Sequence, residues 1–423
     1  MITRRDTLLA AALAATPGLV MAAPRKAPFE RLGWASKTPG GDGGQVIRVK
    51  TLAGGGPGSL REAIAAKGPR TIVFDVGGVI DLARHSLKVT EPFLTIAGET
   101  APSPGITLIK GSLAIESHDV IVRHIRVRAG RDGEPSKSGW EVDGITCWKA
   151  HDVIVDHCST SWATDENLSA SGPRFSGGED PTGWRDGTSH RITFSNNIVA
   201  EGLSNASHVK GEHSKGSLIH DNAYEVLIAR NLYAHNRERN QLFKGGVEAV
   251  SVNNLIYDPG TRCMHYALNA SEWVGHQWRV GQLAIAGNVV KGGASTRPDL
   301  PFLIVEGQGD LELYASDNPA RYADGTEMSP VRILNTDPFP EMSPVRILNT
   351  DPFPKIKLLT KPPFWPEGLK LMPSSQVEAY VLANAGARPW DRDATDRRII
   401  REYKAGTGRV IDDEQEVGGY PKA

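Results

Sequence analysis

The chain has 423 residues, of which 48 are Lys or Arg and 49 are Asp or Glu, so its formal net charge is −1. Hydrophobic residues at 39% and charged residues at 23% are typical of a globular protein and exclude a disordered chain. The lack of a basic excess argues against a nucleic-acid binder, and three cysteines are too few for a disulfide framework. The 45 glycines follow no Gly-X-Y period, which excludes collagen and indicates many tight turns.

Residues 1–23 have the pattern of an export signal. Arg4 and Arg5 precede an apolar run that begins at Leu8, and the segment ends in two alanines. The arginine pair resembles a twin-arginine signal, although an ordinary secretory signal shares the general pattern. The run is short for a membrane span, and no later run is long enough for one. We therefore expect a secreted or periplasmic protein with no membrane partner.

From about residue 70 the chain consists of short β-rich runs separated by Gly, Asn and His. Apolar residues alternate within these runs, which predicts strands, and helical periodicity is nearly absent between them. One position recurs in six runs at separations of 33, 40, 34, 23 and 34 residues. Its occupants are His124, His157, Asn197, Asn231, Asn254 and Asn288.

The spacing of these six residues indicates a solenoid. A shortest period of 23 residues, lengthened where loops intrude, is typical of stacked β-coils. An inward asparagine at each turn can then bond to the backbone and to its neighbours in adjacent coils. A β-sandwich is the alternative, but its turn signals recur every ~8–12 residues. We predict an all-β, single-domain parallel β-helix over residues 24–326, with loop insertions.

The C-terminal part of the chain contains a perfect tandem duplication. The sequence EMSPVRILNTDPFP occupies residues 327–340 and again 341–354. Its prolines predict an extended loop without regular structure. Helix-forming residues between Ser375 and Ala387 predict one helix. We interpret residues 327–423 as a C-terminal extension that packs on the β-helix.

Two carboxylates recur at the period of one coil. Asp143 and Asp165 are 22 residues apart, so in a solenoid they would share a face with one strand spacing, ~4.8 Å, between them. Such a pair repels unless a cation bridges it, and oxygen ligands favour Ca²⁺. Glu141 would point the same way on a strand, and Glu166 could contribute from a turn. Independent surface carboxylates remain open on spacing alone.

Cations follow at a similar interval. Lys215 and Arg239 are 24 residues apart, and Lys244 is five residues beyond Arg239. This predicts a basic column beside the acidic one, an arrangement that suits an anionic polymer bound through a metal and cations together. A scatter of unrelated surface charges is the open alternative.

Several segments, in this order and spacing, resemble the pectate lyases of polysaccharide lyase family 1. They are residues 40–82, DGITCW at 143–148, HDVIVDHCSTSWATDENLS at 151–169, HSKGSLI at 213–219, RNQLFKGGVEAVSVNN at 239–254, and residues 384–421. The resemblance implies a right-handed parallel β-helix. It also implies cleavage of polygalacturonate, an acidic plant polysaccharide, by Ca²⁺-assisted β-elimination.

The resemblance assigns the acidic residues to calcium. Asp143 and Asp165 match calcium aspartates, and Glu141 sits where some members carry a further one. Ser169 replaces a usual aspartate, and Glu166 could compensate for that loss.

The resemblance assigns the basic residues to the substrate and to proton transfer. Lys215 matches the lysine that holds a substrate carboxylate, and Arg239 matches the arginine taken as catalytic base. Lys244 replaces a second arginine and lacks its forked geometry. Arg237, with Lys215, would help to favour a neutral Arg239.

Three other functions share the scaffold. A pectin lyase would act on methylated substrate without calcium, which the aspartate pair disfavours. A β-helix polysaccharide hydrolase would use Asp156, Asp165 and Glu166 as acid and base. A non-catalytic polysaccharide-binding protein is kept open by Ser169 and Lys244.

The remaining chemically active side chains are assigned to structure. We interpret Cys147, Cys158 and Cys263 as buried, unpaired thiols, and His157 and His213 as parts of coil turns. No sequence feature indicates an oligomer interface, so we expect a monomer.

Overall fold

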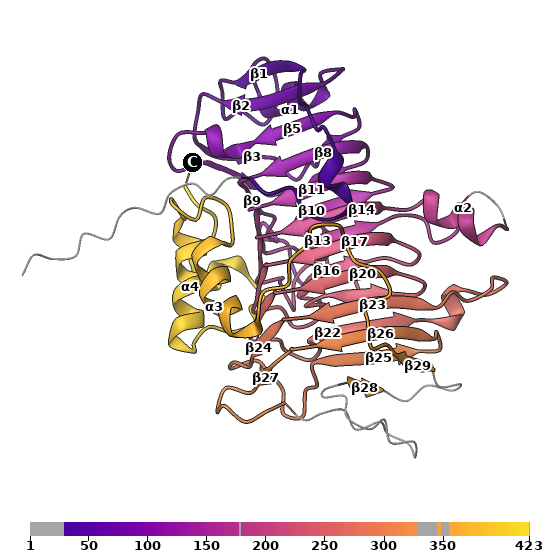
Figure 1. Cartoon of the computed structure of the whole chain (residues 1–423). Helices are drawn as coiled ribbons and strands as arrows, with labels where there is room; N and C mark the ends of the chain where they lie inside the picture. The colour runs from indigo at the N-terminus through magenta and orange to yellow at the C-terminus, as the bar shows by residue number, and fades with distance from the viewer. Residues whose placement is uncertain (1–28, 177–178, 329–344, 348–354, 423) are drawn as a thin grey trace, which may run out of the picture.

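The computed structural model describes residues 29–176, 179–328, 345–347 and 355–422. Within these residues the chain winds into a parallel β-helix, with its N-terminal coils at the top of Figure 1 and later coils stacked below. The predicted fold class is confirmed. The predicted export signal lies outside the described residues, as does most of the duplicated segment.

Three parallel sheets form the described walls of the helix. The first sheet contains β1 Gln45–Val49, β2 Arg70–Phe74, β5 Leu94–Ala97, β8 His118–Arg123, β11 His151–Asp156, β14 His190–Ser195, β17 Tyr224–Ala229, β20 Glu248–Val252, β23 Gly281–Ala286, β26 Leu311–Ser316 and β29 Ile356–Leu358. The second contains β3 Gly78–Asp81, β6 Ile106–Ile109, β9 Ile125–Arg128, β12 Ser159–Ser161, β15 Ile198–Ala200, β18 Leu232–Ala234, β21 Leu255–Tyr257, β24 Val289–Lys291 and β27 Ala320–Arg321. The third contains β4 Leu87–Val89, β7 Leu113–Ile115, β10 Ile145–Trp148, β13 Glu166–Ser171, β16 Lys215–Ile219, β19 Leu242–Lys244, β22 Met264–Leu268, β25 Leu303–Gly307 and β28 Val345–Ile347.

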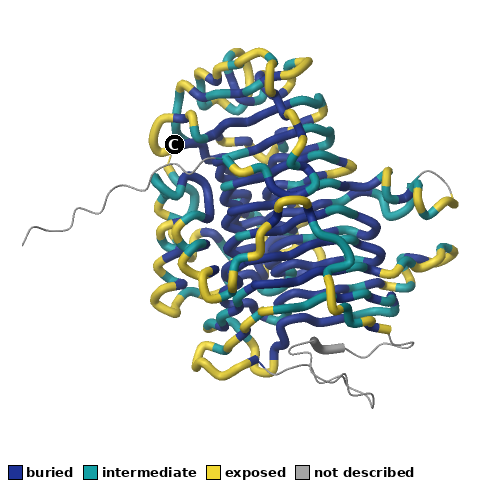
Figure 2. Tube along the Cα trace, in the orientation of Figure 1, coloured by how far each residue is buried: buried dark blue, intermediate teal, exposed yellow. Residues whose placement is uncertain are grey.

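From β2 to β28 each coil contributes one strand to each sheet in turn, as β11, β12 and β13 do in a single coil, whereas β1 and β29 extend the first sheet alone. Alternate side chains point inward and stack on those of the next coil, so that Val153 pairs with Ile192 and Ile192 with Val226. Figure 2 shows the buried residues running through the middle of the coils and the exposed ones in the loops. The core is one continuous apolar column, which fixes the register of every strand.

The turn between the first and second sheets carries the predicted asparagine ladder. Asn197 accepts from the Cys158 backbone and bonds to Asn231, which bonds to Asn254, and the chain of contacts continues through Asn288. It then extends to Asn318, which the spacing did not predict. Each side chain also donates to a carbonyl of the preceding coil, so these buried amides are satisfied within the ladder.

The two histidines that were assigned to this ladder lie outside it. His157 is in register with Asn196, and Cys158 occupies the position equivalent to Asn197. His124 and His157 instead have φ values of 57° and 48° and stack on each other with ring centroids 5.0 Å apart. The predicted position was therefore one residue off in these coils, because the turn places a left-handed residue directly before the ladder residue.

Helices lie outside the sheets. They are α1 Leu60–Ala65, α2 Pro181–Asp186, α3 Ser374–Asn384 and α4 Ala394–Ala405, with 3₁₀ turns η1 Trp34–Lys37, η2 Gly98–Thr100, η3 Ala270–Glu272 and η4 Glu414–Val417. The helix expected between Ser375 and Ala387 is confirmed as α3. Figure 1 shows α3 and α4 side by side against the second sheet.

Apolar packing and buried ion pairs hold the two C-terminal helices on the β-helix. Val377 and Ile399 pack against Leu232 and its neighbours in the second sheet. Arg128 of β9 lies 2.6 Å from Asp396 of α4, and both side chains are fully buried. Among the described residues, no helix is both long and apolar enough to cross a membrane.

Strands continue beyond residue 326. β29 pairs with β26, and β28 pairs with β25. Val345–Ile347 belongs to the second copy of the duplication, so the expectation of no regular structure was wrong for these three residues. A short β-branched stretch can complete a sheet edge despite the prolines around it.

We predict that deleting residues 341–354 leaves activity intact. The first copy has the same sequence, so its residues 331–333 can supply the same Val-Arg-Ile strand to β25. Thermal melting and the polygalacturonate assay described below would check this. Loss of folded protein on deletion would show that both copies are needed.

The cysteine prediction is confirmed. Cys147, Cys158 and Cys263 are buried and unpaired, and burial raises the pKa of each thiol, to about 12 for Cys158. They therefore act as small apolar core residues rather than as reactive groups.

Candidate active site

The predicted site residues gather where the chain passes from the second sheet to the third. Asp143 lies two residues before β10, Glu166 is the first residue of β13, and Lys215 is the first residue of β16. Glu166 pairs in register with Lys215, which bridges in turn to Glu238. Because the coils stack in register, residues far apart in sequence form one column along this edge of the third sheet.

The column begins with an acidic cluster. Carboxylate oxygens of Asp143, Asp165 and Glu166 lie within 4.8 Å of one another. The Glu166 backbone donates to Asp143 Oδ1 at 3.1 Å, and Ser169 Oγ lies 3.5 Å from Asp143 Oδ2. Burial and the neighbouring Asp165 raise the pKa of Asp143 to about 7. Two carboxylates this close are stable together only with a proton or a cation between them.

Basic side chains continue the column. Arg239 forms an ion pair with Glu166, and Lys215 Nζ lies 3.1 Å from Glu238 Oε1. Burial lowers the pKa of Arg239, while the nearby Asp165 and Asp143 act against this shift. Arg239 has φ 57°, a conformation that turns the backbone just before β19. The acidic and basic residues predicted from spacing are therefore neighbours in space.

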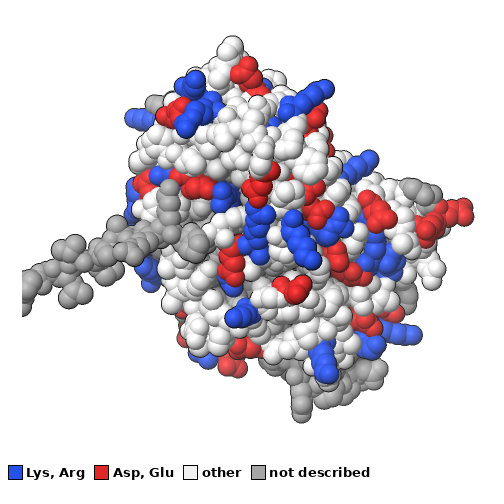
Figure 3. All heavy atoms as spheres, turned by 45° about the horizontal axis from the view of Figure 1, so that its top comes forward, with Lys and Arg blue, Asp and Glu red and all other residues white. Residues whose placement is uncertain are grey.

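A buried histidine marks where the cations converge. Burial lowers the pKa of His265 well below its usual value, and Arg262, Arg239, Lys215 and Lys244 each lower it further. These four cations thus surround one point on the third sheet, while the wider surface in Figure 3 mixes both signs of charge. Positive charge is a local property of this site and not of the whole molecule.

Two predicted substrate-binding residues have partners outside the acidic cluster. Lys244 Nζ lies 2.5 Å from Glu272 Oε2, in a network that includes Arg174. Arg237 lies 2.6 Å from Glu212 and is partly exposed. Lys244 is mostly buried beside the other cations, whereas Arg237 lies at the partly exposed rim of the column.

Glu141 does not lie with Asp143, Asp165 and Glu166. It precedes β10 in a loop, so the alternation of a strand does not apply to it. Its Oε1 atom lies 3.4 Å from His208 Nδ1 and accepts from the Val209 backbone. Strand alternation therefore does not fix the direction of Glu141 relative to Asp143, and its role as a calcium ligand stays a prediction.

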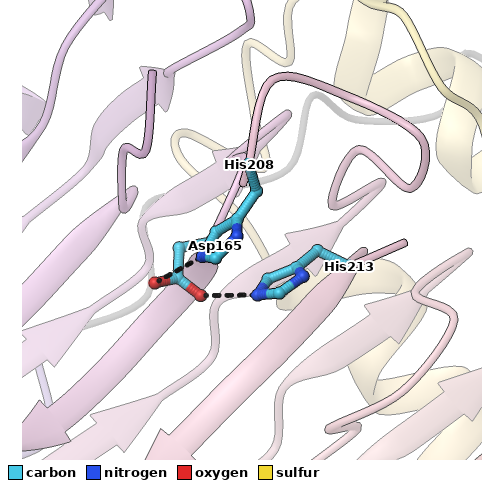
Figure 4. Close-up of side chains that lie close together, drawn as sticks. All are labelled: Asp165, His208 and His213. Carbon is cyan, nitrogen blue, oxygen red and sulfur yellow. Dashed lines mark ion pairs between the residues drawn. The ribbon is translucent and has the colours of Figure 1, made fainter. Parts of the chain in front are cut away.

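A histidine pair completes the surroundings of Asp165. His208 Nε2 lies 3.7 Å from Asp165 Oδ2, and His213 Nε2 lies 3.6 Å from Asp165 Oδ1, as Figure 4 shows. The sequence pattern predicts no role for His208 and only a structural one for His213. Their H-x₄-H spacing, which resembles that of metal-ligand pairs, was the signal that could have found them.

Comparisons with known proteins identify the family. A protein named "Probable pectate lyase C" from Emericella nidulans is 31% identical over 390 residues, covering 92% of this chain and 78% of its own. A protein of the same name from Aspergillus terreus is 31% identical over 392 residues, covering 92% and 80%. The chain belongs to the pectate lyase family. It is therefore a polysaccharide lyase, although no family model matches it.

Solved structures share the fold of this pectate lyase family member. The cedar pollen allergen Jun a 1 has a TM-score of 0.56 at 16% identity, covering 84% of this chain and 92% of its own. A pectate lyase bound to a hexasaccharide has a TM-score of 0.55 at 14% identity, covering 85% and 97%. At such identities the likeness supports the fold alone.

The residues of the hydrolase alternative do not come together. Asp156 ends β11 in the first sheet, where it is buried and accepts from Ser195 and Asn196. Asp165 and Glu166 lie at the opposite end of β12. A pair of carboxylates around a water is thus not formed with Asp156, in agreement with membership of a lyase family.

Proposed function

We propose that this chain is an exported pectate lyase that cleaves polygalacturonate by calcium-assisted β-elimination, with Arg239 as the base. The observation that carries the proposal is the column on the third sheet, where Asp143, Asp165 and Glu166 adjoin Arg239 and Lys215. Such a column offers a cation site and fixed positive charges to one acidic sugar polymer.

The residues present fit calcium. Oxygens that share a Ca²⁺ ion at ~2.4 Å each lie at most ~4.8 Å apart, and the three carboxylates meet this limit. Ser169 retains an oxygen beside Asp143, in place of the carboxylate usual in the family. Asp143, Asp165 and Glu166 would hold the ion, which when bound supplies positive charge next to a uronate carboxylate.

Elimination requires a base at C5 of the uronate. The base removes the C5 proton, the electron pair forms the C4–C5 double bond, and the glycosidic oxygen leaves C4 and takes up a proton. Guanidinium is normally charged, so an arginine base needs surroundings that favour its neutral form. Burial lowers the pKa of Arg239, and the nearby Arg262 acts in the same direction.

Lys215 and Lys244 have the charge to hold substrate carboxylates. Lys215 is almost fully buried, so its interaction with an anion would be weakly screened by solvent. Trp148 lies on the same sheet and is 44% exposed, which suits stacking against a sugar ring. Arg237 at the rim could bind a further uronate.

Export rests on the sequence of residues 1–23, with its arginine pair and apolar run. A secreted or periplasmic site would give the enzyme access to plant polysaccharide. We further propose that the enzyme acts as a monomer, without nucleic-acid or membrane partners.

The test is near-ultraviolet absorbance of polygalacturonate incubated with the purified mature chain, with calcium and with chelator. Elimination leaves an absorbing unsaturated uronate, so we expect a rise that requires calcium. New reducing ends without absorbance would mean hydrolysis and contradict the proposal. Binding without any cleavage would favour a non-catalytic protein, and a calcium-independent rise on methylated polymer would indicate a pectin lyase.

A further inference from the structure

Two loops leave the third sheet at the edge where the chain passes on to the first sheet. One loop joins β13 to β14 and carries Arg174, and the other joins β22 to β23 and carries Glu272. Lys244 is the last residue of β19 at the same edge, and it is one of the four cations around His265. The side chains of Arg174, Glu272 and Lys244 meet in one ion-pair cluster.

Glu272 bridges the two cations of this cluster with a single oxygen. Its Oε2 atom lies 2.5 Å from Lys244 Nζ and 3.0 Å from Arg174 Nη2. Burial raises the pKa of Glu272, but the hydrogen bond from Lys244 and the charges of both cations outweigh burial and hold this pKa below its ordinary value. The carboxylate is therefore ionised, and it shows how one carboxylate is held between Lys244 and Arg174.

Arg174 is fixed in place by groups other than Glu272. Its Nε atom donates to Asp221 Oδ2 at 3.0 Å, and its backbone carbonyl oxygen accepts from Asn222 Nδ2 at 2.7 Å. Asp221 is fully buried, so its position is set by the fold. A guanidinium has five N–H donors, and Asp221 and Glu272 engage only two of them. Arg174 therefore retains donors for a ligand.

Glu272 is held less firmly than the loop that carries it. The next residue, Trp273, is buried, and its Nε1 atom donates to Asp221 Oδ1 at 2.9 Å. The side chain of Glu272 is 34% exposed, against 14% for Lys244 and 22% for Arg174. Rotation of the Glu272 side chain to another rotamer can thus free both cations while Trp273 keeps the loop anchored.

We propose that Lys244 and Arg174 form a subsite for one uronate carboxylate of the substrate, and that Glu272 occupies this subsite in the free protein. The inference rests on the acidic substrate of the proposed function. A uronate carboxylate has the charge and the paired oxygens of the Glu272 side chain, so it can replace Glu272 on both cations. Glu272 is then an internal competitor that weakens the binding of acidic sugar units. It does not compete in the same way with methyl-esterified units, which carry no charge at this position.

The experiment measures the binding of a galacturonate hexamer, and of its methyl ester, to the full-length mature chain by isothermal titration calorimetry. Chelator prevents cleavage, and low salt keeps the ion pairs weakly screened. Glu272→Gln removes the competitor, so we expect it to tighten binding of the acidic hexamer by roughly 3–10-fold. Binding of the methyl ester should change by less than about twofold. Arg174→Gln should weaken binding of the acidic hexamer by roughly 3–10-fold.

Glu248→Gln is the matched control. Glu248 forms an ion pair with Arg185, which belongs to the same loop as Arg174, but it lies on β20 in the first sheet. The substitution removes the same charge and loosens the same loop without touching the subsite, so hexamer binding should stay within about twofold of wild type. Circular dichroism would verify that each variant is folded, and Glu272→Gln suffices if Arg174→Gln is not.

Unchanged binding of the acidic hexamer in Glu272→Gln would overturn the proposal. Equal tightening for the acidic hexamer and its methyl ester would also overturn it, because a loosened loop and not charge competition would then be the cause. In the absorbance assay with calcium, the KM for polygalacturonate should fall in Glu272→Gln by more than kcat changes. A wild-type chain that gives no calcium-dependent absorbance would contradict the lyase reaction alone, since the binding measurements need no cleavage.

Discussion

Replacing Arg239 with lysine is expected to lower kcat on polygalacturonate by roughly 10²–10⁴-fold, the usual contribution of a positioned base. Lysine keeps a positive charge near Glu166, so the buried carboxylate retains a partner. It cannot reproduce the planar guanidinium of Arg239, which lies three residues before β19 (Leu242–Lys244). The measurement is kcat at saturating calcium and polymer, with folding checked by thermal melting.

Arg230→Ala is the matched control for Arg239. Arg230 also has a positive φ, 61°, and also forms an ion pair, with Glu30 at 2.7 Å, but it lies at the turn between the first and second sheets. We expect its kcat to stay within about twofold of wild type, as for a partly exposed ion pair away from the site. A folded Arg239→Lys enzyme with near-normal kcat would contradict the base assignment.

The fold could be predicted because polar residues recur in the sequence at the period of one coil. Asn197, Asn231 and Asn254 recur since each buried amide must bond to the next coil. The predicted ladder position is one residue too early at His124 and His157. Both histidines occupy the left-handed turn position, which directly precedes the ladder residue. The spacing of residues in the sequence does not give the backbone conformation of each turn residue. It therefore does not show which of two adjacent turn residues points inward.

The site was predictable where it follows the coils and missed where it does not. Asp143 and Asp165 are separated by one coil, and the structure places them together. Glu166 and Lys215 lie in register on neighbouring strands, so they also follow the coils. His208 lies in a long loop with no period, so only tertiary folding brings it to Asp165. Glu141 was placed by strand alternation in a segment that is not a strand.

Asp143→Asn is expected to abolish the response of the protein to calcium. In the calcium-free protein, burial and Asp165 raise the pKa of Asp143 to about 7, above its ordinary value of 3.8. The folded state then holds this proton more tightly than the unfolded state does. Stability of the calcium-free protein should therefore fall as pH rises from about 4 to about 7, when the buried carboxyl must ionise.

Calcium should reverse this trend, because it binds the ionised form. Below pH ~7 a proton competes with the ion, and the apparent calcium affinity should fall by up to about tenfold per pH unit. Thermal melting with calcium and with chelator, from about pH 5 to about pH 8, would measure both effects. We expect the calcium-induced rise in Tm to grow with pH in the wild-type protein.

In Asp143→Asn the titrating group is gone, so the melting temperature in chelator should vary less with pH and the calcium-induced rise should disappear. Asp75→Asn is the control, since Asp75 is partly exposed in an ion pair with Arg48 far along the chain from the cluster. It should keep the wild-type response. The substitution replaces one of the three acidic calcium ligands of the column with a neutral amide. A calcium-induced rise in Tm that is undiminished in Asp143→Asn would therefore mean that the ion binds elsewhere.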